Sequence, residues 1–239
     1  KFGFKNIRII DNFVFDTYRS AITIQAVDGG EIENVVVDSL TSINTGNAIY
    51  LVLGQRRADA HKLITIDKEL NKIRRSKLDN VRISHVYAEV PATKPDAGYE
   101  YEGPIEDQPR NTSPSSIVGL ADNHITNVSI SDVEIVYPGG GDPDYAKVGT
   151  DELDKVPEMP KAYPEFSQHK ELPAWGFYVR HADNVKFSNV KLTAKAKDYR
   201  PAVVLDDVQG GSFKKIKVAE PSAGKKPKIF VYKSKNISK

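Results

Sequence analysis

A short phrase recurs along this 239-residue chain: an asparagine is followed by a run in which apolar residues alternate. The phrase occurs at residues 6–9, 34–37, 80–83, 127–130 and 184–187. A second apolar run follows it, as at residues 21–24 and 48–53. Alternation with a period of two is typical of strands rather than helices. Recurrence at this spacing indicates stacked units, because one unit alone cannot bury its apolar face.

The spacing of the phrases also locates three insertions. Successive asparagines are 28, 46, 47 and 57 residues apart, and 28 residues suffice for one turn of a stack. We assign the excess to residues 55–77, 91–116 and 138–172, and insertions in repeat proteins form loops, often on the binding face. A structural role is expected for the asparagines themselves, since an asparagine amide can hydrogen-bond to its equivalent in the next coil and the residue tolerates turn conformations. The sequence therefore predicts an all-β solenoid, with residues 1–239 as a single domain.

Composition narrows the class of protein. There is no cysteine, so neither a disulfide nor a thiolate metal site is expected. There is no run of eighteen apolar residues, so no membrane partner is predicted. A net charge of +2 and basic runs without interleaved aromatic residues argue against nucleic acid. No spacing among the five histidines matches a zinc or facial-triad motif, so we predict no metal and no cofactor.

Six stretches of the chain resemble glycoside hydrolase family 28, the polygalacturonase-like pectinases, and in particular a bacterial branch of that family. They read RSAITIQAVDGGEIEN at 19–34, GNAIYLVLGQR at 46–56, YPGGG at 137–141, AYPE at 162–165, LPAWGFYVRHA at 172–182 and RPAVV at 200–204. They span nearly the whole chain in the order of the family. The resemblance implies a right-handed parallel β-helix, a pectic oligosaccharide or polysaccharide as partner, and a periplasmic or secreted location.

The family's chemistry is inverting hydrolysis of α-linked galacturonic-acid-type bonds. One carboxylic acid protonates the leaving oxygen while a carboxylate base activates water. The family takes these acids from Asn-Thr-Asp and Gly-Asp-Asp phrases, with a Gly-His-Gly phrase one coil later, and this chain has none of the three. The resemblance therefore places them in N-terminal coils that precede residue 1. We expect this chain to be the C-terminal portion of the helix, to stack on those missing coils, and to be inactive alone.

The adjacent pair Asp206 and Asp207 does not replace the missing acids in this interpretation. The pair follows an apolar run, whereas the family's acid pair follows a glycine and opens a strand. Neighbouring residues on a strand point to opposite faces, so the two carboxylates would converge only at a bend. We interpret the pair as part of a turn or coil corner.

The family also has an Arg-Ile-Lys phrase that holds the carboxylate of the substrate. The strand best placed for it here reads Thr-Ile-Gln at residues 23–25, without the two basic residues. Gln25 is then a candidate hydrogen-bond donor to a sugar, and Arg19 and Arg56 are candidate replacements, because a guanidinium pairs with carboxylates through a planar fork. The alternative for each arginine is an ordinary solvated surface residue.

A second candidate site lies between residues 163 and 181. Tyr178 offers an aromatic ring, Arg180 can clamp a carboxylate, and His181 can bond to that carboxylate or to a sugar hydroxyl. Glu165 is the candidate acid in the preceding insertion. The single tryptophan, Trp175, is expected to pack the insertion onto the core.

Two other function classes stay open. One is a carbohydrate-binding or structural β-helix without hydrolysis. The other is a polysaccharide lyase on the same fold, which requires acidic clusters for calcium and an arginine or lysine base.

Overall fold

The computed structural model describes residues 3–56, 75–93, 111–144, 146, 148–169, 171–221 and 226–239. Most of the first predicted insertion, at 57–74, and of the second, at 94–110, therefore lies outside the described residues. The described part is built from strands and two short 3-10 helices, which confirms the predicted all-β class. None of its helical segments has the length and apolarity that crossing a membrane requires.

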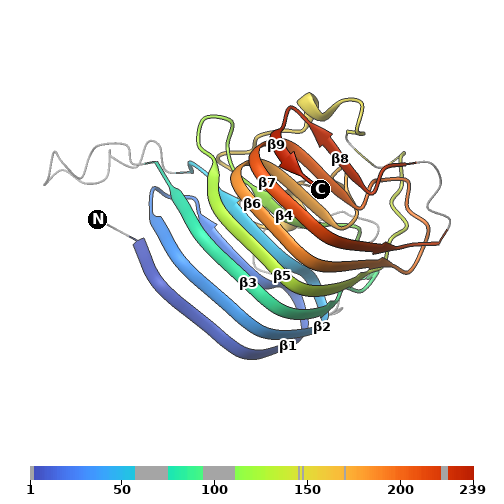
Figure 1. Ribbon diagram of the computed structural model, residues 1–239, viewed down its shortest axis with the longest axis horizontal. Helices are drawn as coiled ribbons and strands as arrows, with labels where there is room; N and C mark the ends of the chain where they lie inside the picture. The colour runs from blue at the N-terminus through green and yellow to red at the C-terminus, as the bar shows by residue number, and fades with distance from the viewer. Residues whose placement is uncertain are drawn as a thin grey trace, which may run out of the picture.

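Nine strands in the described residues form one sheet in which every pairing between strands is parallel (Figure 1). The order is β1-β2-β3-β5-β6-β7-β8, with β4 pairing with β2 and β6, and β9 pairing with β7. The strands are β1 (Gly3–Ala26), β2 (Glu31–Leu53), β3 (Lys77–Glu89), β4 (Ser115–Val118), β5 (Ile125–Tyr137), β6 (Phe177–Ala194), β7 (Val203–Ala219), β8 (Ile229–Tyr232) and β9 (Lys235–Ser238).

The register of this pairing places equivalent residues of successive strands next to one another, and we call such a set a column. The apolar residue after each recurring asparagine forms one column, because Ile7 pairs with Val35, Val35 with Val81, Val81 with Val128, and Val128 with Val185. The last four of these side chains are almost completely buried. The period found in the sequence is thus the period of the strand stack.

The recurring asparagines occupy corners where the long strands bend. All five have positive φ angles between 54° and 60°, a left-handed conformation that asparagine tolerates better than most residues. The amide of Asn34 donates to Asn6 at 2.9 Å, that of Asn80 to Asn34 at 2.7 Å, and that of Asn184 to Asn127 at 2.6 Å. The predicted contact between equivalent asparagines is confirmed at these three steps.

The column of asparagines is interrupted once and replaced once. Between β3 and β5 the amide of Asn127 donates instead to the carboxylate of Asp79, at 2.7 Å. On β7 the corner position is taken by Gly210, with φ of 75°. Glycine meets no steric penalty at positive φ, so the corner depends on backbone conformation first and on the amide second.

A second set of corners lies five residues further along. There the residues with positive φ are Asp11, Ser39, His85, Asp132, Asn189 and Lys215. At each corner two consecutive residues face outward, and inward-facing apolar residues resume after it. The corners therefore bend each strand without exposing the core.

The interior of the strand stack is a continuous apolar core, and aromatic residues lie at its β6–β7 end. Phe187 lies between Phe177 and Phe213, with ring centroids 4.9 and 5.1 Å away. Trp175 is buried and meets the ring of Tyr137 edge-on at 5.8 Å. The prediction that Trp175 packs into the core is confirmed.

The third predicted insertion, residues 138–172, is a loop that includes the 3-10 helices η2 (Leu153–Lys155) and η3 (Phe166–His169). Apolar residues in its described part pack against the outward faces of strands. Leu153 and Val156 join Tyr178 and Val204 in one buried cluster, and Phe166 joins Tyr50 in another. We call residues 138–172 the covering loop.

A buried ion pair anchors the two ends of the covering loop. Arg200 contacts both carboxylate oxygens of Asp198 at 2.9 Å and donates to the carbonyl oxygens of Thr112 and Leu172 at 2.9 and 3.1 Å. The backbone N–H of Gly141 donates to the same carboxylate at 2.9 Å. Burial alone would raise the pKa of Asp198, but the hydrogen bonds and the charge of Arg200 lower it overall.

The corner column gives a first prediction. Asn34→Ala should lower the free energy of unfolding by about 2 kcal/mol, since it loses two amide contacts and places a Cβ-bearing residue without side-chain compensation at positive φ. Asn34→Gly should cost less, because glycine adopts that conformation freely. Urea denaturation followed by circular dichroism measures both. Equal losses for alanine and glycine would show that corner conformation is not the determinant.

The anchor gives a second prediction. Asp198→Asn should destabilise the protein by about 3–5 kcal/mol, because it leaves the Arg200 guanidinium buried without its counter-charge. Denaturation at pH 7 measures this loss.

The same carboxylate adds a pH dependence. A lowered pKa in the folded state means that Asp198 stabilises the fold above its unfolded pKa of about 3.9 and loses that effect as pH falls through the lower folded value. The stability difference between wild type and Asp198→Asn should therefore shrink in strong acid. A difference that stays constant down to pH 2 would contradict this assignment.

Candidate functional site

The six residues predicted to bind substrate fall into two groups in the structure. The first group, Arg19, Gln25 and Arg56, lies at the β1–β2 end of the sheet, beside residues 160–165 of the covering loop. The second group, Tyr178, Arg180 and His181, lies on β6. We call the first group, together with Tyr163, the arginine patch.

The covering loop holds two members of the arginine patch in place. The Gln25 amide donates to the carbonyl oxygen of Pro164, and the Arg19 guanidinium pairs with the carboxylate of Glu165. Glu165 is buried, while the Arg19 side chain is 41% exposed. Glu165, the candidate acid, thus serves as the buried counter-charge of an accessible arginine.

Arg56 presents a pre-oriented guanidinium at the same end of the sheet. Its Nε and Nη2 contact the two carboxylate oxygens of Asp28 at 3.1 and 2.7 Å, in the bidentate geometry typical of strong arginine–carboxylate pairs. The hydrogen bonds that Arg56 donates to the Asp28 carboxylate raise the pKa of Arg56 above its ordinary value. The guanidinium lies 5.9 Å from the ring of Tyr163, which is 45% exposed. One face of this cluster therefore places a guanidinium beside an aromatic ring.

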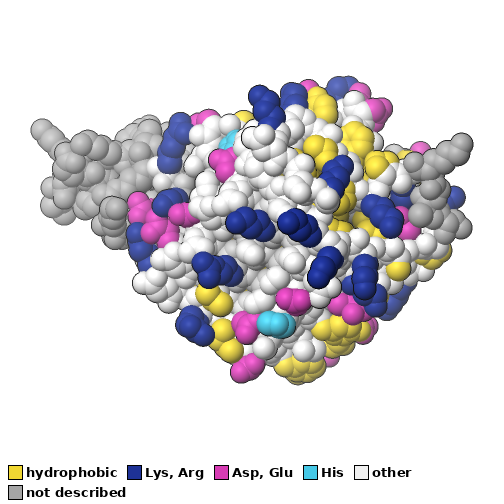
Figure 2. All heavy atoms as spheres, viewed as in Figure 1, with side chains coloured by type: hydrophobic (Ala, Val, Ile, Leu, Met, Phe, Trp, Pro, Cys, Tyr) yellow, Lys and Arg dark blue, Asp and Glu magenta, His cyan; other side chains and the backbone are white. Residues whose placement is uncertain are grey.

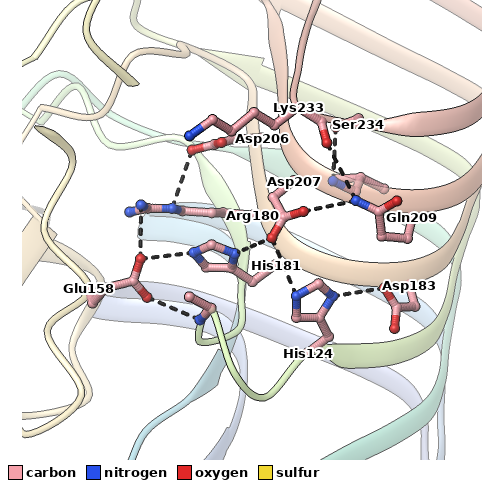
Figure 3. A network of polar contacts seen from close by, with 12 residues as sticks. His124, Glu158, Arg180, His181, Asp183, Asp206, Asp207, Gln209, Lys233 and Ser234 are labelled. Atoms are coloured by element: carbon pink, nitrogen blue, oxygen red, sulfur yellow. Dashed lines mark hydrogen bonds and ion pairs between the residues drawn. The ribbon is translucent and has the colours of Figure 1, made fainter. Parts of the chain in front are cut away.

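The second group is embedded in a network of charged residues (Figure 3). Arg180 pairs with Glu158 at 2.9 Å, donates to the carbonyl oxygen of Val156 at 2.7 Å, and places its Nε 3.2 Å from Asp206. The Nε contact is an ion pair without hydrogen-bond alignment. The Tyr178 hydroxyl donates to the Asp206 carboxylate at 2.9 Å. The covering loop thus buries Tyr178 and Arg180 and supplies partners for the arginine.

His181 lies at a corner, with φ of 50°, and its ring is held from both sides. Nδ1 is 2.8 Å from Asp207 Oδ2, and Nε2 is 2.9 Å from Glu158 Oε1. Burial lowers the pKa of His181, but the contacts with Glu158 and Asp207 raise it above the ordinary value overall. The corner interpretation of Asp207 agrees with its φ of 54°.

The two carboxyl groups of the Asp206–Asp207 pair have opposite electrostatic environments. Burial raises the pKa of Asp206 although Tyr178 and Arg180 act against it. Burial also acts to raise the pKa of Asp207, but the hydrogen bonds from His181 and Gln209 lower it overall. Each carboxylate is occupied by a different neighbour, so the pair does not present two free acids on one face.

His124 joins this network from the turn before β5. Its Nδ1 is 2.8 Å from Asp183 Oδ1, and its Nε2 is 3.4 Å from Asp207 Oδ2. His124, His181 and Asp207 each offer a ligand atom, and these atoms lie within 4.8 Å of one another. Within the part of the chain that the structure describes, this is the group of histidine and acidic residues arranged to hold a metal ion.

A shallow groove of about 730 Å³ lies elsewhere on the surface, across the second set of corners. It crosses one outward column, formed by Phe13, Thr41, Tyr87, Glu134, Lys191 and Lys217. In Figure 2 lysine and arginine side chains are spread over the strands on the visible face of the molecule. The sequence did not predict this groove, because the residues that form it share a column of the sheet and not a sequence motif.

The partners of the predicted residues were not visible from local sequence. Asp28 is 28 residues from Arg56, the spacing of one strand layer, so the period alone could have paired them. Glu158 comes from the covering loop and has no such signal. His124 and His181 are 57 residues apart, a separation that includes this loop, so no fixed metal-ligand spacing connects them.

Comparisons with known proteins give no match: no family model, no curated protein and no solved structure is significantly similar to this chain.

Burial of Tyr178 gives a third prediction. Tyr178→Phe should lower the free energy of unfolding by about 1–3 kcal/mol, because the Asp206 carboxylate loses a buried donor. If the chain binds acidic glycans, as the resemblance implies, this variant should bind them with wild-type affinity, because the covering loop separates the ring from solvent. A loss of glycan affinity without a loss of stability would instead make Tyr178 a ligand contact.

Proposed function

We propose that this chain is a right-handed parallel β-helix of the pectinase type and that it binds an acidic pectic glycan at the arginine patch. The parallel, in-register stack and its asparagine corners support the β-helix. The sequence stretches that resemble family 28 supply the choice of substrate class. In this proposal the chain contributes substrate binding to a glycosidase that hydrolyses galacturonic-acid-type bonds.

The observation that carries the proposal is that Arg19, Gln25 and Arg56 each contact the same short segment of the covering loop, residues 163–165. A guanidinium can bind a uronate carboxylate through two parallel hydrogen bonds, and a tyrosine ring can pack on the apolar face of a sugar. Arg56 and Tyr163 are already placed side by side. A chain of uronic acids presents both kinds of group in each residue, so it matches both halves of the patch.

The proton transfer is assigned to other strand layers. An inverting glycosidase places two carboxyl groups about 6.5–9.5 Å apart, on either side of the bond that it cleaves. At the arginine patch the carboxylates of Glu165 and Asp28 each neutralise an arginine. They orient the cations, and we propose that the acid and the base come from the preceding coils that the resemblance implies.

The exposed edge of the sheet supports such coils. β1 pairs only with β2 among the described strands, and it carries the most exposed large apolar side chains. Phe4, Phe13 and Phe15 are 68%, 60% and 59% exposed. Phe13 faces the groove, but Phe4 belongs to the column of Ile32 and Leu78, which are 9% and 0% exposed, so a further parallel layer stacked on β1 would cover the Phe4 ring.

Non-catalytic carbohydrate binding is the second candidate, and the groove favours it. Phe13 and Tyr87 face the groove, beside Lys191 and Lys217. Aromatic rings and cations along one column could also follow an acidic polysaccharide, without any contribution from the arginine patch. The polysaccharide lyase has less support, because the metal-capable group of the described residues contains two imidazoles, whereas calcium selects oxygen ligands.

The test is calorimetric titration with trigalacturonate and, as a neutral comparison, galactotriose. Arg56→Ala should weaken trigalacturonate binding by about 10–100-fold, the effect of losing a charged hydrogen-bonding group. Arg75→Ala is the matched control, because Arg75 is also an accessible arginine, paired with Asp122, and lies outside the patch. The Arg75→Ala variant should bind trigalacturonate with wild-type affinity.

Three outcomes would contradict the proposal. Equal affinity for the acidic and neutral trisaccharides would remove the uronate as the recognised group. Equal losses of trigalacturonate affinity in Arg56→Ala and Arg75→Ala would show that the effect is one of net charge. Wild-type affinity in both variants would indicate that trigalacturonate binds at the groove. The same samples should release no reducing ends from polygalacturonate, and release by this chain alone would contradict the assignment of proton transfer to preceding coils.

A further inference from the structure

The corner after Arg180 brings together three side chains from distant parts of the sequence. Ile125 pairs with Ala182, and Ala182 with Val208, so the residues before them, His124, His181 and Asp207, belong to one column. Adjacent parallel strands lie about 4.8 Å apart, which is close enough for side chains of one column to meet. Figure 3 shows both imidazole rings directed toward the Asp207 carboxylate.

The atoms that converge have the spacing of a coordination shell. Asp207 Oδ2 is 2.8 Å from His181 Nδ1 and 3.4 Å from His124 Nε2, and the set lies within 4.8 Å. A tetrahedral ion with bonds of about 2.0–2.1 Å holds its ligand atoms about 3.3 Å apart. Small side-chain shifts would therefore bring all three atoms onto one ion.

Each of the three side chains also makes a second polar contact, through an atom that is not directed at the other two. His181 Nε2 is 2.9 Å from Glu158, and His124 Nδ1 is 2.8 Å from Asp183. The Gln209 amide donates to the other oxygen of Asp207 at 2.8 Å. When a ring nitrogen donates its proton to a carboxylate, the other nitrogen presents its lone pair, and this arrangement is the one that metal-binding histidines use.

With those tautomers, two nitrogen lone pairs and a carboxylate oxygen face one another. A cation that lies between the members of such a set would stabilise it. A proton can bridge one pair of atoms, whereas a metal ion can satisfy all three.

We propose that His124, His181 and Asp207 bind a divalent transition-metal ion of the zinc class. Imidazole nitrogen suits zinc and its neighbours, whereas calcium and magnesium prefer a shell of oxygen atoms. The carboxylates of Asp207, Glu158 and Asp183 surround the site, and the Arg180 guanidinium offsets only part of their charge. Three protein ligands leave a fourth position for water or a bound ligand.

The ion would act across three strand layers. It would tie the turn before β5 to β6 and β7, and through Glu158 it would tie the covering loop to the same corner. An ion that binds only the folded chain stabilises it in proportion to the logarithm of the ion concentration over the dissociation constant. The site is therefore expected to raise the thermal midpoint when metal is added.

The test uses the chain stripped of metal with EDTA, dialysed, and titrated with ZnCl₂ by calorimetry. One ion should bind per chain. His124→Gln and Asp207→Asn, which remove ligands, should each weaken binding by more than about 10-fold, and Asp183→Asn, which removes a positioning contact, by about 10-fold. His85→Gln is the matched control, since His85 also lies at a corner beside a carboxylate, that of Asp38, but outside the column. Its zinc affinity should be unchanged.

A spectroscopic readout keeps the proposal testable if a variant fails to fold. Circular dichroism and the thermal midpoint in EDTA establish whether each variant is folded. Co²⁺ added to the wild type should give the intense visible bands of a tetrahedral site, and Zn²⁺ should abolish them. Absence of saturable zinc binding in the wild type, absence of those bands, or wild-type affinity in folded His124→Gln and Asp207→Asn would each overturn the proposal.

Discussion

Parallel pairing in register is the constraint on which the rest of this structure depends. It aligns the residues of successive strands in columns, so a residue type that suits one position is repeated at the equivalent position of the next strand. Val35, Val81, Val128 and Val185 form a buried column for this reason. Corners repeat for the same reason, because a strand that bends where its neighbour is straight would break the ladder between them.

The columns also explain which features the sequence reveals. The recurring asparagines predicted both the strands and the hydrogen-bonded contacts between equivalent asparagines, because corner and core positions carry their own residue preferences. Where a corner position accepts several residue types, the sequence pattern does not predict the corner. Gly210 and Lys215 occupy such positions without an asparagine. The second set of corners was missed because aspartate, serine, histidine and lysine all occur there, and only the φ angle is common to them.

The candidate site was less predictable than the fold. The sequence singles out Arg56, Arg180 and His181 as candidates, but not the acids that orient them. Asp28 is one strand layer away from Arg56, so the period contains that information. Glu158 lies in a loop without periodicity, and the way in which this loop packs depends on tertiary contacts of residues such as Leu153 and Val156. The burial of Tyr178 follows from that packing and cannot be derived from its own neighbours in the sequence.

The connections between strands have a further consequence. Equivalent corner residues are separated by 28 residues at one step and by 57 at another, yet the pairing of the flanking strands is the same. Connection length is therefore decoupled from the geometry of the scaffold. Such an architecture can accept connections of different length between neighbouring layers, because the strands on either side keep the same register.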